Sequence, residues 1–119
     1  MKTLVELLAS HCRDATHAIS EADVVRQLQV IDQWTFAGGA LSRTYQFKNY
    51  YETMAFVNAL AYLVHRENHH PELRVSYSSC EVRYNTHSIN GISQNDFISA
   101  AKVDALFSSN THSGGAAKA

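Results

Sequence analysis

Apolar residues recur along this chain with two different periods, and the first of them indicates a helix after residue 20. Ser20 suits a helix N-cap, and Glu21 and Asp23 place negative charge in the first turn, where it is favourable. The apolar positions that follow have the spacing of one helix face: Val24, Leu28 and Ile31. The pattern predicts an amphipathic helix ahead of the first strand.

Residues 33–47, QWTFAGGALSRTYQF, have the pattern of a β-hairpin. Gly38 and Gly39 can adopt the positive φ angles that a two-residue turn requires. The second strand separates its side chains onto two faces: Leu41, Tyr45 and Phe47 on one, Ser42, Thr44 and Gln46 on the other. Arg43 interrupts the apolar face.

A longer helix is predicted to begin at Asn49, which forms a capping pair with Glu52. Its apolar stripe is Phe56, Leu60, Leu63 and Val64. The helix should stop before Pro71, because a residue that precedes proline avoids the α region. His69 therefore lies near the helix end, and His70 is expected to be extended.

Alternation returns between Leu73 and His87 and predicts a second hairpin, with its turn near Ser79 and one polar face. Ser93 and Asp96 form a capping pair before a last helix. The apolar side of that helix consists of Phe97, Ala101, Val103 and Phe107.

The predicted order is α-β-β-α-β-β-α, which indicates an α+β fold. Hairpin connections imply a four-stranded antiparallel sheet, with the three helices packed on one face. The length of 119 residues suits a single domain spanning residues 1–119. We expect its ordered part to cover about residues 11–107 and the small, polar tail 108–119 to be flexible.

Composition excludes several classes of function. The formal net charge is −1 and the basic residues form no run, which argues against nucleic-acid or anionic-membrane partners. Cys12 and Cys80 are expected to be free thiols in a reducing compartment. The N-terminus is a poor signal peptide and no apolar run approaches a membrane span, so a cytoplasmic protein is expected.

Histidine supplies the candidate chemistry, because the stretch ENHHPEL places His69 and His70 side by side and His87 follows 17 residues after His70. Imidazole can take or give a proton near neutral pH. If the strand that leads to His87 ends beside the helix terminus, the three rings line one cleft. An isolated histidine is usually structural, and His11, His17 and His112 are interpreted that way.

Metal binding is a competing interpretation. His65 and His69 are four residues apart on one helix, a spacing that can hold zinc. No HExxH motif or second pair supplies the remaining ligands. GxSxG, P-loop and GxGxxG motifs are also absent from the sequence.

HHPEL, followed by Tyr77, His87 and Asp96, resembles the signature of the pterin-4a-carbinolamine dehydratase family, bacterial branch. Five residues separate Pro71 from Tyr77, nine separate Tyr77 from His87, and eight separate His87 from Asp96. The stretches DQW, YQFKNY and HSINGISQNDFISAA are similar to this family as well, so the resemblance covers residues 11–107.

The resemblance implies the fold argued above and the dehydration of 4a-hydroxytetrahydrobiopterin to quinonoid dihydropterin and water. That reaction recycles the pterin cofactor of aromatic amino acid hydroxylases and needs no cofactor or metal of its own. By position, the catalytic residues are His69, His70 and His87. The implied substrate-binding residues are Asn68, His69, His70, Asn85, Thr86, His87 and Ser88.

One position departs from the family pattern, because His65 occupies the place of an acidic residue. Glu67 is near but two positions out of register, so the pairing of His69 is expected to differ. The alternative function is a non-enzymatic binding module, since some members of the family act as coactivators. Unpaired sheet edges and the apolar Leu41, Tyr45 and Tyr77 predict a homodimer or homotetramer.

Overall fold

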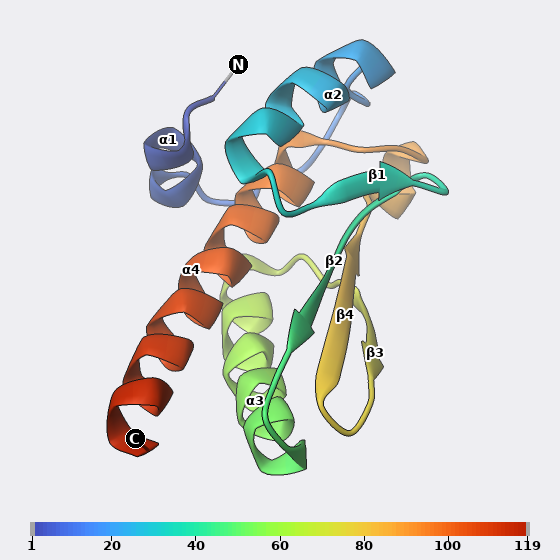
Figure 1. Ribbon diagram of the computed structural model, residues 1–119. Coiled ribbons are helices and arrows are strands. Elements are labelled where there is room, and N and C mark those ends of the chain that lie inside the picture. The colour runs from blue at the N-terminus through green and yellow to red at the C-terminus, as the bar shows by residue number, and fades with distance from the viewer. Residues whose placement is uncertain (1, 119) are drawn as a thin grey trace.

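The computed structural model describes the backbone of residues 2–118 and the side chains of residues 2–109. Its elements, in chain order, are α1 (Leu4–Ala9), α2 (Glu21–Leu28), the 3₁₀ helix η1 (Gln29–Ile31), β1 (Thr35–Ala37), β2 (Ala40–Gln46), α3 (Tyr50–Glu67), β3 (Glu72–Val75), β4 (Ser79–Tyr84), the 3₁₀ helix η2 (His87–Ile89) and α4 (Gln94–Lys118). Figure 1 shows α3 and α4 packed side by side against one face of the sheet. The predicted α+β class and element order are confirmed, with α1 as an addition.

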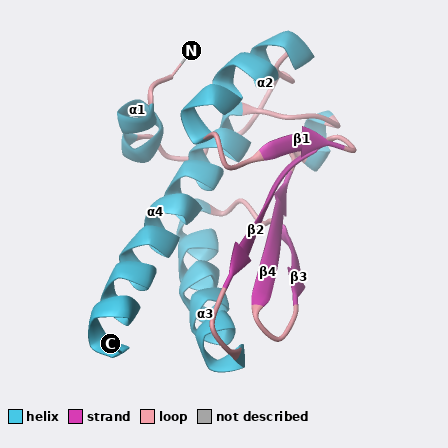
Figure 2. Ribbon diagram, in the orientation of Figure 1, coloured by secondary structure: helices cyan, strands magenta, loops and turns pink. Residues whose placement is uncertain are grey.

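The four strands form one antiparallel sheet in the order β1-β2-β4-β3 (Figure 2). Its register places Leu41 opposite Tyr84 and Tyr45 opposite Cys80. These four side chains lie on the face toward the helices and are almost wholly buried. The polar residues of β3 and β4 lie on the opposite face, where Glu72 is opposite Arg83. The alternation in the sequence therefore reports the two faces correctly.

Local signals placed the turns and helix starts. Gly38 and Gly39 have φ angles of 61° and 76°, as the two-residue turn between β1 and β2 requires. The Ser20 hydroxyl accepts a hydrogen bond from the Asp23 backbone N–H, 3.2 Å away. Asn49 caps α3 in the same way, accepting from the Glu52 N–H at 2.9 Å. Each of these features follows from residues close in sequence.

The structure adds a helix ahead of residue 11, where the ordered part was expected to begin. Residues Leu4–Ala9 form α1, which begins with a capping box between Thr3 and Glu6. Leu7 is fully buried in the core, so this short helix is held by tertiary packing. At the other end, the helical backbone of α4 continues past Phe107 to Lys118. The flexibility of residues 108–119 stays a prediction.

The surface argument for assembly also needs correction. Leu41 and Tyr45 are buried within the subunit, at 0% and 1% exposure, so their side chains are covered without a partner chain. Tyr77 remains 67% exposed.

Within residues 2–118, no helix is both long and apolar enough to cross a bilayer.

Candidate active site

A histidine–carboxylate pair connects the end of α3 with the start of α4. His69 lies just after α3, and its Nε2 is 2.6 Å from Oδ1 of Asp96 in the first turn of α4. The Asp96 side chain is fully buried, and 13% of the His69 side chain is exposed. A buried carboxylate at this distance fixes both the ring orientation and the proton-bearing nitrogen of a histidine.

The second oxygen of Asp96 is held by the segment that precedes His87. Oδ2 accepts hydrogen bonds from the Thr86 hydroxyl at 2.8 Å and from the Ser93 backbone N–H at 2.9 Å. The Thr86 and Ser93 hydroxyls are also 2.7 Å apart. The capping pair predicted for Ser93 and Asp96 is confirmed. Asp96 thus joins the His69 segment to the segment of His87.

Tyr84 supports the other side of His69. The two rings stack at 14° with centroids 5.4 Å apart. Tyr84 ends β4 and is 1% exposed. Burial raises the pKa of its phenol, while the Ser99 hydroxyl acts in the opposite sense. The phenol therefore stays protonated, and its ring provides a fixed platform for the imidazole.

The α3 terminus turns the histidine pair away from the helix. The helix ends at Glu67, and Asn68 adopts the left-handed conformation with φ 54°. Asparagine tolerates this conformation better than most residues, so it can close a helix where glycine is absent. The helix stops before Pro71, as predicted, and His70 is exposed. His69 faces Asp96 while His70 remains accessible to a ligand.

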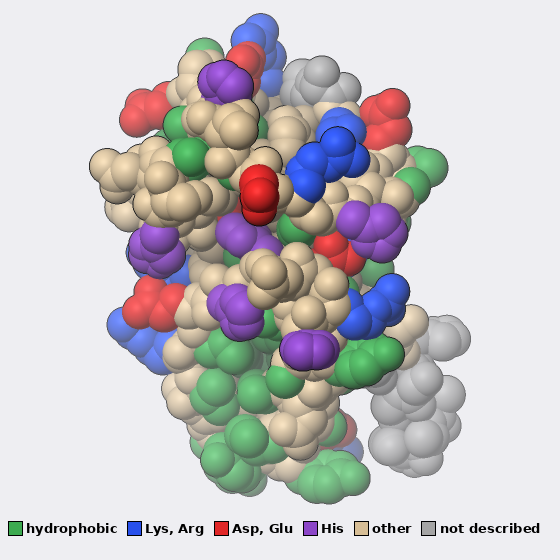
Figure 3. Space-filling model, turned by 180° about the vertical axis from the view of Figure 1, so that it is seen from behind, with side chains coloured by type: hydrophobic (Ala, Val, Ile, Leu, Met, Phe, Trp, Pro, Cys, Tyr) green, Lys and Arg blue, Asp and Glu red, His purple; other side chains and the backbone are tan. Residues whose placement is uncertain are grey.

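His87 lies on a small closed loop and not on a strand. β4 ends at Tyr84, and Thr86 forms an isolated antiparallel bridge with Gly91. His87 begins η2 between these bridge residues and is exposed, as is Ser88. Asn85 is half-buried. Histidine side chains gather on one face of the molecule (Figure 3). The cleft shared by His69, His70 and His87 stays a prediction.

The residues predicted to bind substrate therefore differ in accessibility. Asn68, His70, His87 and Ser88 are exposed, whereas Thr86 is buried behind them. The Thr86 hydroxyl donates to Asp96, so Thr86 supports the carboxylate that contacts His69. Sequence reasoning gave Asp96 only a capping role and a place in the family signature. Its spacing from His87 was the signal that could have assigned it to the site.

No acidic side chain of α3 pairs with His69, although His65 stands where the family pattern has an acidic residue. His65 is exposed on α3, and Glu67 does not take the place of the acidic residue beside His69. The Glu67 carboxylate instead lies 2.7 Å from the Lys102 ammonium group. Within the described residues, no group of three or more His, Cys, Asp or Glu side chains could hold a metal ion. The candidate site comprises the His69–Asp96 pair, with the exposed His70 and His87 in the two segments that Asp96 joins.

Fold and site together define a small α+β protein with a buried histidine–carboxylate pair between the end of α3 and the start of α4. The model of the family described as pterin 4 alpha carbinolamine dehydratase matches residues 17–106. The chain belongs to this family. A provisionally named pterin-4-alpha-carbinolamine dehydratase of Nitrosospira multiformis is 44% identical over 111 residues, covering 90% of this chain and 98% of the relative. A relative of the same name from Nitrosomonas europaea is 50% identical over 99 residues, covering 82% and 88%.

Solved structures show the same fold. A transcriptional coactivator/pterin dehydratase from Brucella melitensis matches with a TM-score of 0.71 and 27% identity, covering 75% of this chain and 97% of that one. A pterin dehydratase-like protein described as a RuBisCO assembly factor in the α-carboxysome matches with a TM-score of 0.52 and 24% identity, covering 61% and 84%. The second likeness concerns the fold alone.

Proposed function

We propose that this protein dehydrates 4a-hydroxytetrahydrobiopterin to quinonoid dihydropterin and water. In this role it recycles the pterin cofactor of an aromatic amino acid hydroxylase. Family membership supports the class of reaction. The observation that carries the proposal is the His69–Asp96 pair, because it gives one member of the histidine trio a fixed orientation and tautomer.

The reaction needs two proton transfers and no electron transfer. The bond between C4a and the hydroxyl oxygen breaks, with help from the lone pair of the neighbouring ring nitrogen. One proton must reach the departing oxygen to release water, and another must leave the ring nitrogen to give the quinonoid product. Positioned imidazoles can perform both transfers, each worth about 10²–10⁴-fold in rate.

The contacts of His69 suggest its part in this chemistry. Oδ2 of Asp96 already accepts from an N–H and an O–H, as an ionised carboxylate does. Nε2 of His69 then donates to Oδ1, which leaves the lone pair on Nδ1. His69 can therefore receive a proton at Nδ1 while Asp96 stabilises the imidazolium. The exposed His70 and His87 would contact the substrate and its departing hydroxyl.

A stopped-flow assay with chemically generated 4a-hydroxytetrahydropterin tests the proposal. Chelator-treated protein should speed the loss of water above the rate in buffer. Turnover no faster than buffer would refute the reaction. Activity that chelation abolishes and zinc restores would instead favour the metal interpretation of His65 and His69.

A non-enzymatic role is the alternative, because the Brucella relative is described as a coactivator as well as a dehydratase. A variant with His69, His70 and His87 replaced by glutamine separates the two. Loss of cellular function in this variant, with the fold retained, supports the enzyme. Full function without the three imidazoles supports the binding module.

We also propose that the chain assembles as a homodimer or homotetramer. Tyr51, Tyr62 and Tyr77 are 81%, 68% and 67% exposed. Hydrophobic side chains also gather on the lower part of the histidine-bearing face (Figure 3). Exposed aromatic surface of this kind is typical of an interface. Light scattering at micromolar concentration should give the mass of two or four chains, and a monomer across a hundredfold dilution would refute assembly.

A further inference from the structure

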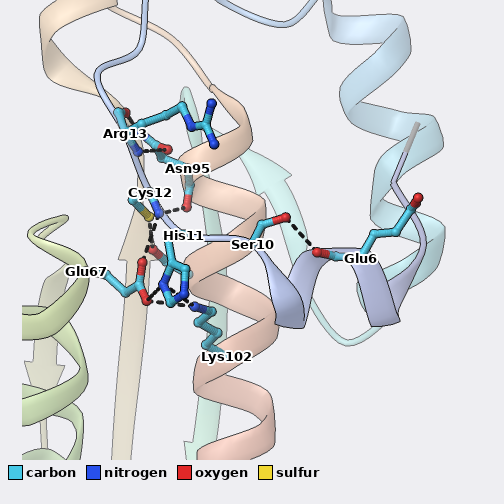
Figure 4. A network of polar contacts seen from close by, with 9 residues as sticks. Glu6, Ser10, His11, Cys12, Arg13, Glu67, Asn95 and Lys102 are labelled. Atoms are coloured by element: carbon cyan, nitrogen blue, oxygen red, sulfur yellow. Dashed lines mark hydrogen bonds and ion pairs between the residues drawn. The ribbon is translucent and has the colours of Figure 1, made fainter.

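The N-terminal segment contains a short connection that crosses between α3 and α4. Residues His11–Arg13, here called the strap, have no regular secondary structure and lie between these helices (Figure 4). They precede the family-matched region, which begins at residue 17. Two of their polar contacts are with Glu67 of α3 and Asn95 of α4, and Cys12 Sγ is also 3.4 Å from the Ser99 hydroxyl oxygen on α4.

The first contact is with Glu67, the last residue of α3. Its Oε1 accepts from the Cys12 backbone N–H at 2.9 Å, and its Oε2 is 3.1 Å from Nδ1 of His11. Lys102 of α4 completes the group, with its Nζ 2.7 Å from Oε2 (Figure 4). The Glu67 side chain is only 4% exposed. This carboxylate is fixed two residues before His69.

The second contact is with Asn95, in the first turn of α4. The Arg13 N–H donates to Oδ1 of Asn95 at 3.1 Å, and Nδ2 of Asn95 donates back to the Arg13 carbonyl at 2.6 Å. The Cys12 thiol also donates to the Asn95 carbonyl, 3.6 Å away. The oxygen and the nitrogen of the Asn95 side-chain amide thus both bond to the backbone of Arg13. Asn95 directly precedes Asp96.

The two contacts hold the chain neighbours of both members of the His69–Asp96 pair. That pair is a single hydrogen bond of 2.6 Å between residues 27 apart in sequence, so it depends on the relative placement of the α3 end and the α4 start. We propose that the strap sets this placement, and that Glu67 and Asn95 are positioning residues for His69. The inference rests on the proposed dehydration, in which an oriented His69 takes up a proton.

A structural role alone would affect stability without affecting the imidazole, so the test needs two readouts. Glu67→Gln removes the charge that faces the strap and Lys102, and Asn95→Ala removes the clamp on Arg13. Asp104→Asn is the matched control, because Asp104 lies on α4 and accepts from Trp34, Arg43 and Tyr45, away from the strap. This control makes the same carboxylate-to-amide change as Glu67→Gln, at a carboxylate that also accepts several hydrogen bonds.

The first readout is steady-state kinetics of the full-length variants. Both strap variants should lose about 10-fold in kcat, with KM changed by less than about twofold, because small misplacements of reacting groups lower the rate of the chemical step. Asp104→Asn should keep the wild-type kcat at a temperature where all variants are folded. An unchanged kcat in both strap variants would overturn the proposal.

The second readout is the proton on Nε2 of His69, observed by NMR of ¹⁵N-labelled protein and assigned with His69→Gln. It should exchange slowly in the wild type and in Asp104→Asn, and at least about 10-fold faster in both strap variants, since a buried charge-assisted bond retards exchange. Equal exchange in the wild type and the strap variants, or equal acceleration in the control, would overturn the positioning role.

The two readouts also separate this inference from the proposed function. A wild-type protein that turns over no substrate, but whose His69 proton responds to the strap variants as expected, refutes the dehydratase and leaves the strap supported. Turnover in the wild type together with an unresponsive His69 proton refutes the strap and leaves the dehydratase supported.

Discussion

Two aspartates on α4, Asp96 and Asp104, accept hydrogen bonds from side chains of other elements, yet they serve different ends. Asp96 is fully buried and accepts from His69, whose ring is part of the candidate active site. Asp104 is 23% exposed in its side chain and accepts from Arg43 at 2.7 Å and from Trp34 at 2.9 Å, with Tyr45 as a third donor.

The difference lies in the partners and not in the carboxylates. Guanidinium and indole do not change protonation near neutral pH, so Asp104 serves to hold β2 and the residue before β1 to α4. The Tyr45 pKa is raised by burial, and further by the Asp104 charge, so the phenol adds a third permanent donor. Imidazole in general changes protonation in that range, so the same kind of contact at Asp96 suits the proton transfer proposed for His69.

Exchanging each carboxylate for an amide should separate the two roles most strongly. Asp96→Asn should lower kcat by about 10³-fold, because the amide cannot stabilise the imidazolium of His69 or favour its Nε2–H tautomer. Asp104→Asn should leave kcat near the wild-type value and lower the free energy of unfolding by about 2 kcal/mol, since Arg43 loses a charged partner. Stopped-flow turnover and urea denaturation measure the two effects. Equal losses of kcat in both variants would break the comparison.

A second contrast concerns stability in acid. Burial alone raises the pKa of Glu67, but the donors Lys102, Cys12 and His11 outweigh it and lower the pKa to about 2 from an ordinary 4.5. A lowered folded-state pKa gives stability that is present above pH 4.5 and is lost as pH falls toward 2. The wild type should therefore lose about 3 kcal/mol more unfolding free energy than Glu67→Gln between pH 5 and pH 2.

The control for this acid effect is Glu72→Gln. Glu72 is 79% exposed in its side chain and lies 3.5 Å from Arg83 on the outer face of the sheet. Such surface pairs contribute little to stability. Denaturation curves of Glu72→Gln across the same pH range should follow the wild type. If Glu67→Gln followed it too, the Glu67 network would carry no acid-sensitive stability.

The smallest expected effect separates two exposed histidines of the same region. His70→Ala should lower kcat by about 10²-fold, because it removes a proposed acid–base group. His65→Ala should change kcat by less than His70→Ala, since His65 is exposed on the α3 surface before the histidine pair. Stopped-flow assays of both variants at one pH provide the measurement. A greater loss at His65 than at His70 would overturn the assigned roles.

Much of the fold could be predicted because its signals are local. The N-caps at Ser20 and Asn49 depend on residues three positions away, and the Gly38–Gly39 turn depends on two adjacent φ angles. Alternation in β2 and β4 reported the buried face correctly. The sequence pattern did not predict α1, because a six-residue helix has little stability of its own and this one is held by the burial of Leu7.

The candidate site also has a part that the sequence predicted and a part that only the structure shows. The sequence alone identified the His69–His70 pair, His87 and the family to which their spacing belongs. It could not show which carboxylate serves His69, because Glu67 is two residues away in sequence and Asp96 is 27. Packing of α3 against α4 turns Glu67 toward Lys102 and the strap, and brings Asp96 to Nε2 of His69. Local propensities set the elements and their chemistry, whereas hydrogen bonds between distant residues exist only once the helices pack.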